Sequence, residues 1–213
     1  MPASPNARRN EVRRYGLLSL TPALALFAAC NQPAPTPAPV SAPAAQAAPA
    51  ESPAEHGKYL VTLGGCDDCH SPKVFKETGP EPDMTRRLSG HPAADKPAAV
   101  PAGLIAPDKW GAVGSNDFTA WSGPWGTSFT ANLTPDKATG LGSWTADMFV
   151  KALKTGKHQG EGRPILPPMP WQNFAQLKEE DLRAIFAFLQ TLPAIQNAVP
   201  DPVPPAGAPP AKK

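Results

Sequence analysis

Residues 64–70 read Gly-Gly-Cys-Asp-Asp-Cys-His, and this stretch decides how the rest of the chain is interpreted. Two residues separate Cys66 from Cys69, and His70 follows directly. This C-x-x-C-H spacing is typical of covalent haem attachment. Both sulfurs can add to the two vinyl groups of one porphyrin, and the histidine then lies below the iron as an axial ligand. Because the chain contains one such motif, we expect one covalent haem c, held by Cys66, Cys69 and His70.

Two other kinds of site use a pair of cysteines at this spacing. A thioredoxin-like redox pair requires a βαβ context, and no such pattern is visible around the motif. A zinc site requires two further ligands at metal spacing, and the third cysteine, Cys30, lies beyond a Pro/Ala-rich segment. Haem attachment is favoured because every part of the motif then has a chemical role.

Of the 30 prolines in this 213-residue chain, 14 fall within the two short segments 31–54 and 193–213. Nearly every position of the first segment is Pro, Ala, Gln, Ser or Thr, so it lacks the large apolar side chains whose burial would offset the entropy of ordering it. We therefore interpret residues 30–53 as a linker, residues 54–200 as one folded domain and residues 201–213 as a disordered tail.

The N-terminus has the pattern of an export signal. Four arginines precede an apolar run over residues 16–29, which is short for a membrane span and ends in small residues. We predict that residues 1–29 are a signal peptide. Its removal takes away four arginines and one glutamate, which changes the formal net charge from +2 to −1. No basic patch then remains to indicate binding of nucleic acid.

Residues 26–30 read Leu-Phe-Ala-Ala-Cys and resemble the lipobox of bacterial lipoproteins, in which cleavage leaves a lipidated cysteine at the mature N-terminus. The alternative is an ordinary signal-peptidase site after Ala29, but the bulky Phe27 stands where that enzyme requires a small side chain. A lipid on Cys30 would tether the domain, through the flexible linker, to the periplasmic side of the cytoplasmic membrane or to the outer membrane.

Three segments have helical patterns, and no strand ladder is evident. Residues 54–61 precede the motif, residues 145–153 begin with a threonine suited to N-capping, and residues 177–192 carry apolar side chains at helical spacing. The last segment has acidic residues in its first turn, where they suit the helix dipole, and Pro193 ends it. We therefore expect an all-α domain around one haem, with a long loop insertion over residues 71–126.

A helix leading into C-x-x-C-H, a long loop, a methionine in a proline-rich turn and a C-terminal amphipathic helix together resemble the class I c-type cytochromes. The resemblance covers residues 55–200. It is closest in three segments, which read Asn-Leu-Thr-Pro-Asp (132–136), Pro-Pro-Met-Pro-Trp (167–171) and Asp-Leu-Arg-Ala-Ile (181–185). The chain is similar here to single-haem domains that occur alone or as repeats in the cytochrome subunits of periplasmic dehydrogenases. The resemblance implies a cytochrome c-like helical fold and an electron-transfer function.

Met169 is the predicted distal ligand of the iron. It lies in residues 165–171, where three prolines restrict the backbone, so the loop can hold a weak thioether bond at low entropic cost. Methionine–histidine ligation raises the reduction potential of a haem. His158 is a rival ligand, and a distal position open to other molecules is the remaining alternative. Met84, Met148 and His91 are weaker candidates.

The function we predict is one-electron transfer, with no catalytic residue in the chain itself. The expected partners are redox proteins that donate or accept electrons, including a dehydrogenase or a terminal oxidase, and the chain could be the cytochrome subunit of a dehydrogenase complex. The alternative function is a haem peroxidase or gas sensor with an open distal site, although no distal His/Arg pair is evident. Asp67 and Asp68 are interpreted as a solvated face of the motif.

Overall fold

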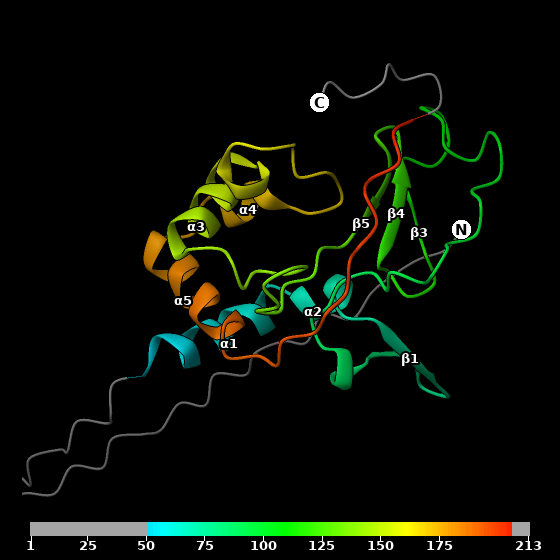
Figure 1. The fold of residues 1–213 in the computed structure, drawn as a ribbon. Coiled ribbons are helices and arrows are strands. Elements are labelled where there is room, and N and C mark those ends of the chain that lie inside the picture. The colour runs from blue at the N-terminus through cyan, green and yellow to red at the C-terminus, as the bar shows by residue number, and fades with distance from the viewer. Residues whose placement is uncertain (1–50, 206–213) are drawn as a thin grey trace, which may run out of the picture. The chain divides into compact units, whose positions relative to one another are not determined.

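The computed structural model describes residues 51–205. Residues 1–50 and 206–213 lie outside the described residues, and with them the predicted signal peptide, Cys30 and almost all of the predicted linker. The helices are α1 (Pro53–Leu63), α2 (Cys66–His70), α3 (Ala146–Thr155), α4 (Trp171–Phe174) and α5 (Glu179–Leu189), with 3-10 turns η1 (Met84–Arg86) and η2 (His158–Gly160). The strands are β1 (Lys73–Lys76), β2 (Gly79–Pro82), β3 (Val113–Gly114), β4 (Ala120–Gly123) and β5 (Gly126–Phe129). Figure 1 shows this arrangement.

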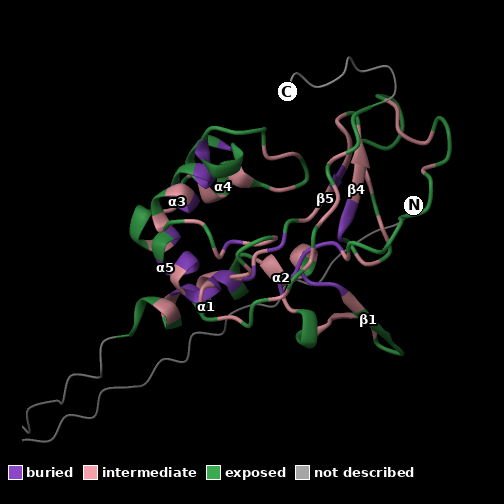
Figure 2. Ribbon diagram, in the orientation of Figure 1, coloured by how far each residue is buried: buried purple, intermediate pink, exposed green. Residues whose placement is uncertain are grey.

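The hydrophobic core forms where α1 and α3 pack against α5. Gly57 of α1 meets the backbone of α5 so closely that a Cβ there would lie 1.8 Å from the carbonyl oxygen of Ala184. Only glycine permits two helices to approach to this distance. On α3, the ring of Phe149 lies 5.4 Å from that of Phe186, measured between centroids. Figure 2 shows buried residues on all three helices, and their removal from water is the main force that holds them together.

Local signals explain where the three long helices begin. Ser52 Oγ accepts a hydrogen bond from Glu55 N, while the Glu55 carboxylate accepts one from Ser52 N, which makes a capping box at the start of α1. The hydroxyl of Thr145 caps α3 in the same position. α5 begins after Lys178 without a side-chain cap, but three acidic residues occupy its first turn. The three helices predicted from the sequence are thereby confirmed.

The prediction of an all-α domain is wrong. Within residues 51–205, two small antiparallel sheets accompany the helices: β1 pairs with β2, and β4 pairs with β3 and β5. All five strands fall within residues 73–129, in and just after the region where a loop was expected. They gave no signal in the sequence because none exceeds four residues and several contain glycine or proline, which ordinarily weaken a strand.

After α5 the chain continues as an extended segment that we call the C-terminal strap (residues 193–205). Figure 1 shows it, coloured orange to red, running from the end of α5 to the edge of β5. Near its end, Val203 exchanges two backbone hydrogen bonds of 2.8 and 2.9 Å with Thr127. The strap therefore connects the helical part of the domain to the three-stranded sheet.

Candidate haem-attachment site

The C-x-x-C-H motif folds into α2, directly after α1. Gly65 precedes α2 in the left-handed conformation, with φ of 61°, and this conformation turns the chain from one helix into the next. Cys66 and Cys69 are three residues apart on α2, so their side chains occupy neighbouring positions on the helix surface. Burial raises the pKa of the Cys66 thiol to about 11 and also raises the pKa of the Cys69 thiol. Neither cysteine forms a disulfide. Because their pKa values are raised, both thiols are neutral, and they occupy neighbouring positions on α2.

The imidazole of His70 is oriented by the backbone. Its Nδ1 lies 2.8 Å from the carbonyl oxygen of Ala131, which is 61 residues further along the chain. A carbonyl can only accept a hydrogen bond, so Nδ1 carries the proton and Nε2 keeps its lone pair. Burial lowers the pKa of His70, which favours the neutral imidazole. A neutral histidine with a fixed tautomer and an available Nε2 has the form that metal-ligating histidines take.

The Ala131 carbonyl is held in place by close backbone packing. Gly90 N donates to the carbonyl oxygen of His70 at 2.7 Å, and His91 N donates to that of Thr130 at 3.0 Å. Gly90 has φ of 79°, and a Cβ on it would lie 2.5 Å from the Thr130 carbonyl oxygen and 2.6 Å from the Ala131 carbonyl carbon. Residues 88–91 thus lie between the end of α2 and the segment that holds its histidine.

Met169 lies in the proline-rich turn that leads into α4. Both Met169 and Cys66 are partly buried against the core cluster. Gly64, just before α2, packs against Phe174 of α4, where a Cβ would lie 3.2 Å from the ring. Ser128 Oγ donates to the carbonyl oxygen of Pro167 at 2.6 Å, which fastens the proline-rich turn to β5. The turn that carries Met169 is therefore fastened to β5 at Pro167 and continues into α4, which packs against Gly64.

These residues fit a covalently attached haem. Two neutral thiols on one helix suit addition to two vinyl groups, the histidine beside them has one ring nitrogen available, and a thioether is positioned by a restrained turn. The thioredoxin alternative required a βαβ unit, whereas the sheets within residues 51–205 are antiparallel. In the same part of the chain, no group of three or more His, Cys, Asp or Glu side chains is arranged to hold a metal ion.

The rival ligands occupy different surroundings. Both ring nitrogens of His91 are already hydrogen-bonded, to Thr119 Oγ1 at 2.7 Å and to the carbonyl oxygen of Asp95 at 3.2 Å. His158 is exposed and packs edge-on to Trp144, with 5.0 Å between ring centroids. Met84 is 64% exposed in η1. Met169 remains the predicted distal ligand because it packs against the cluster that Cys66 also touches, whereas Met84 is exposed.

Several proteins with similar sequences are cytochrome subunits of dehydrogenases. The cytochrome c subunit of alcohol dehydrogenase (quinone) from Gluconobacter oxydans is 41% identical over 81 residues, 37% of this chain and 17% of that protein. The gluconate 2-dehydrogenase cytochrome c subunit of Pantoea cypripedii is 29% identical over 135 residues, 63% and 22% of the two chains. The fructose dehydrogenase cytochrome subunit of Gluconobacter japonicus is 35% identical over 72 residues, which are 34% of this chain and 15% of that protein.

The chain is similar to dehydrogenase cytochrome c subunits. The names of these relatives confirm the resemblance to c-type cytochromes that the motif and its flanking segments indicated. The chain spans less than a quarter of the length of each of these relatives. No family model matches the chain.

A residue of α2 in this cytochrome-like domain forms an ion pair that the sequence did not indicate. Asp67, interpreted as part of a solvated face, accepts hydrogen bonds from Arg87 Nη2 at 2.6 Å and Nε at 3.0 Å, and from Ser71 Oγ at 2.7 Å. The Arg87 guanidinium in turn lies 5.5 Å from the centroid of the Phe188 ring on α5. Nothing in the spacing of the motif signals a partner 20 residues away. The pair links α2 to residues 87–88 and to the core.

We expect Asp67→Asn to lower the free energy of unfolding by about 1–3 kcal/mol at pH 7, because it weakens charge-assisted hydrogen bonds. Burial opposes ionisation of Asp67, but the hydrogen bonds from Arg87 and Ser71 outweigh it and lower the pKa of the carboxyl below its ordinary 3.8. Folding therefore favours the charged form. The contribution of the Asp67 carboxylate to the free energy of unfolding is complete above the ordinary pKa of the group. It is lost as the pH falls through the lower pKa of the folded protein.

Urea denaturation of the full chain at pH 7 and near pH 3 measures both effects. Asp68→Asn is the matched control, since the Asp68 side chain is exposed. At pH 7 the free energy of unfolding should be higher for the parent than for Asp67→Asn. Near pH 3 this difference should be smaller. An equal loss in the Asp68 variant, or a difference that does not change with pH, would contradict this account.

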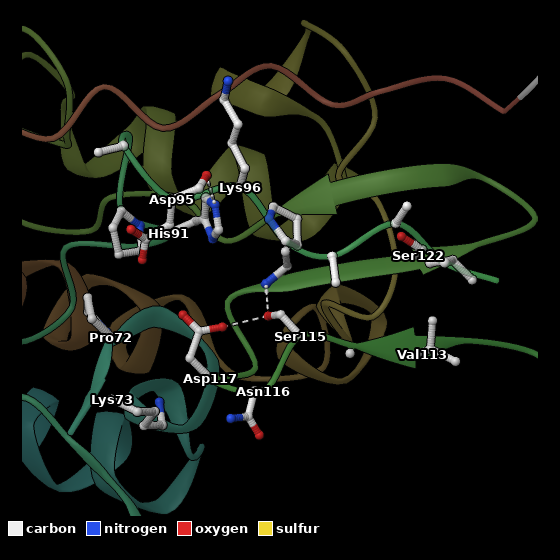
Figure 3. A pocket seen from close by; sticks show the side chains of 18 of the residues that line it. Pro72, Lys73, His91, Asp95, Lys96, Val113, Ser115, Asn116, Asp117 and Ser122 are labelled. Carbon is white, nitrogen blue, oxygen red and sulfur yellow. Dashed lines mark hydrogen bonds between the residues drawn. The ribbon is translucent and has the colours of Figure 1, made fainter. Parts of the chain in front are cut away.

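A cavity of about 690 Å³ lies beside the site, within the insertion. Figure 3 shows Pro72 and Lys73, which closely follow α2, together with His91 and Asp117 along its wall. Ser115 Oγ donates to Asp117 at 2.6 Å, so the carboxylate is already hydrogen-bonded. None of the four predicted haem-binding residues lines this cavity. The cavity is therefore separate from the candidate haem site.

Proposed function

We propose that the chain is an exported, lipid-tethered cytochrome c that carries one haem and transfers one electron at a time. The observation that carries the proposal is the arrangement on α2, where two adjacent thiols precede a histidine whose Nδ1 is bonded to a backbone carbonyl. This arrangement leaves Nε2 available beside the two points of covalent attachment. The similarity to dehydrogenase cytochrome subunits supports the same reading.

Each residue of the site has a separate task in this proposal. Haem c, when bound, supplies the reversible one-electron change between ferrous and ferric iron. Cys66 and Cys69 bind the macrocycle, His70 provides the proximal ligand, and Met169 provides the distal one. The core cluster against which Cys66 and Met169 pack gives the site an apolar side. Two protein ligands leave no vacant coordination position, which suits a carrier better than a peroxidase or a gas sensor.

We propose a dehydrogenase as the electron donor. The three relatives are named as cytochrome subunits of dehydrogenases, and each is several times longer than the segment that matches this chain. A terminal oxidase or another cytochrome is a suitable acceptor, since a carrier must pass its electron onward. The contacts with both partners should be weak and short-lived, because a carrier has to dissociate in order to turn over.

A redox titration of the purified full chain tests this function. We expect one haem per chain by alkaline pyridine spectroscopy, because the sequence has one C-x-x-C-H motif. The haem should titrate as a single reversible one-electron wave, and ascorbate and ferricyanide should reduce and oxidise it repeatedly without loss. Rapid consumption of hydrogen peroxide, or carbon monoxide binding to the reduced parent on mixing, would favour the peroxidase or sensor instead.

The lipid tether is tested at Cys30, which lies outside the described residues. Within residues 51–205 no helix is long and apolar enough to cross a membrane. We expect the parent to sediment with membranes, and Cys30→Ser to appear in the soluble periplasmic fraction or as an unprocessed precursor. Thr36→Ala, in the adjacent linker, is the control and should stay with the membrane. A soluble parent with an unmodified Cys30 would refute the tether.

A further inference from the structure

Asn197 anchors the middle of the C-terminal strap. Its amide nitrogen donates to two carbonyl oxygens, that of Ser89 at 2.7 Å and that of His91 at 2.9 Å. Its amide oxygen accepts a hydrogen bond from Ala93 N at 2.9 Å. Both N–H groups and the oxygen are therefore used on one short segment of chain. Since the two carbonyls flank Gly90, Asn197 holds the segment that packs between α2 and Ala131.

A second anchor joins the strap to the residues just after Ala131. Asn132 Nδ2 donates to the carbonyl oxygen of Ile195 at 2.8 Å, and Ile195 N donates to Thr134 Oγ1 at 3.1 Å. Asn132 Oδ1 also accepts from Thr134 N at 3.0 Å and from its hydroxyl at 2.7 Å. Asn132 is only 4% exposed and Thr134 is fully buried. The backbone at residue 132 thus has little freedom to shift without breaking buried hydrogen bonds.

These two anchors converge on the carbonyl that orients His70. Ala131 lies between Thr130, whose carbonyl oxygen accepts from His91 N, and Asn132, which is bonded to the strap. Leu133 N also donates to the carbonyl oxygen of Leu88 at 2.8 Å. The strap, residues 88–91 and residues 130–133 are therefore linked pairwise by hydrogen bonds. Movement of the strap would be passed to the Ala131 carbonyl through short hydrogen bonds.

We propose that Asn197 and Asn132 are positioning residues of the haem site, through which the C-terminal strap holds the Ala131 carbonyl against His70 Nδ1 and thereby sets the reduction potential. The inference rests on the proposed function, because it requires the iron on His70 Nε2. A strong hydrogen bond at Nδ1 makes an imidazole a better electron donor to its metal. A better donor stabilises ferric iron. Loosening the strap should therefore raise the reduction potential.

Asn197→Ala removes all three hydrogen bonds of the Asn197 side chain. Asn197→Asp keeps the acceptor for Ala93 N and removes both donors. The controls are Gln196→Ala and Gln196→Glu, which make the same chemical changes at the adjacent exposed residue. At one fixed poised potential, each Asn197 variant should show a ratio of reduced to oxidised haem at least about threefold above that of its matched control. The Nδ1 proton of His70 should also exchange with deuterated water faster, as followed by NMR.

The outcomes separate this inference from the proposed function. A parent without covalent haem would end the proposed function itself. The positioning role alone would be overturned by two results obtained together in fully haem-loaded Asn197 variants. Their reduction potentials would equal those of the Gln196 controls, and the Nδ1 proton of His70 would exchange at the parental rate. If neither Asn197 variant accumulates, exchange of the His70 Nδ1 proton is measured in the parent protein. Slow exchange supports the positioning role of the strap. Exchange as fast as that of an exposed imidazole overturns that role.

Discussion

Replacing Cys66 and Cys69 together with alanine should abolish covalent haem in this protein. Thioether bonds survive denaturation, whereas haem held only by axial ligands is lost when the chain unfolds. We therefore expect haem staining after denaturing electrophoresis to be strong in the parent and absent in the double variant. Each single variant should keep one possible attachment point and show reduced staining. The comparison is made in a host that exports the chain and attaches haem.

Cys30→Ser is the matched control, because it removes a thiol outside the motif. Its haem staining per chain should equal that of the parent, even if its location in the cell changes. Equal staining in the parent and in the Cys66→Ala/Cys69→Ala double variant would end the cytochrome c reading. Loss of staining in Cys30→Ser would mean that export or processing, rather than attachment chemistry, controls haem loading.

Met169→Ala should open the distal side of the iron. The parent is expected to resist carbon monoxide and cyanide at neutral pH, because both axial positions are taken by protein ligands. In the variant the vacant position should bind either molecule readily. The weak absorption band of a thioether bonded to ferric iron, near the red end of the visible spectrum, should vanish, and the reduction potential should fall, since methionine ligation raises it.

Met84→Ala controls for the loss of a methionine. Met84 is exposed in η1, so its replacement should leave the spectrum, the potential and the resistance to carbon monoxide unchanged. An unchanged spectrum in Met169→Ala would direct attention to His158, which packs against Trp144 and begins η2, before the proline-rich turn. A parent that binds carbon monoxide at once would favour the sensor or peroxidase.

Features carried by neighbouring residues could be predicted from the sequence. The helix of residues 54–61 was expected, and α1 is present. A capping box at its N-terminus satisfies backbone N–H groups of the first turn. The two cysteines and the histidine were expected in one attachment unit, and they lie on one short helix. In both cases, the deciding interactions span no more than four residues. The roles of Cys66, Cys69, His70 and Met169 toward haem remain predictions.

Features that depend on distant partners could not be predicted. The strands of residues 73–129 are too short and too rich in glycine and proline to show an alternating pattern, so the insertion resembled a loop. Asp67 resembled a solvated carboxylate, although Arg87 holds it in a half-buried ion pair. Neither partner of such a contact carries a local signature, because the contact forms only when the chain folds back on itself.

The amino-acid sequence by itself determined the attachment motif, the three long helices and the restrained turn around Met169, because backbone propensities, caps and prolines act over a few residues. Only the tertiary structure decided which groups orient His70. Its Nδ1 partner, the Ala131 carbonyl, is 61 residues away. Asn197, which follows the last helix, bonds to the two residues on either side of Gly90. A backbone carbonyl is common to every residue, so no side-chain pattern could mark this one. Its role follows from close packing around Gly90, which tertiary folding alone brings about.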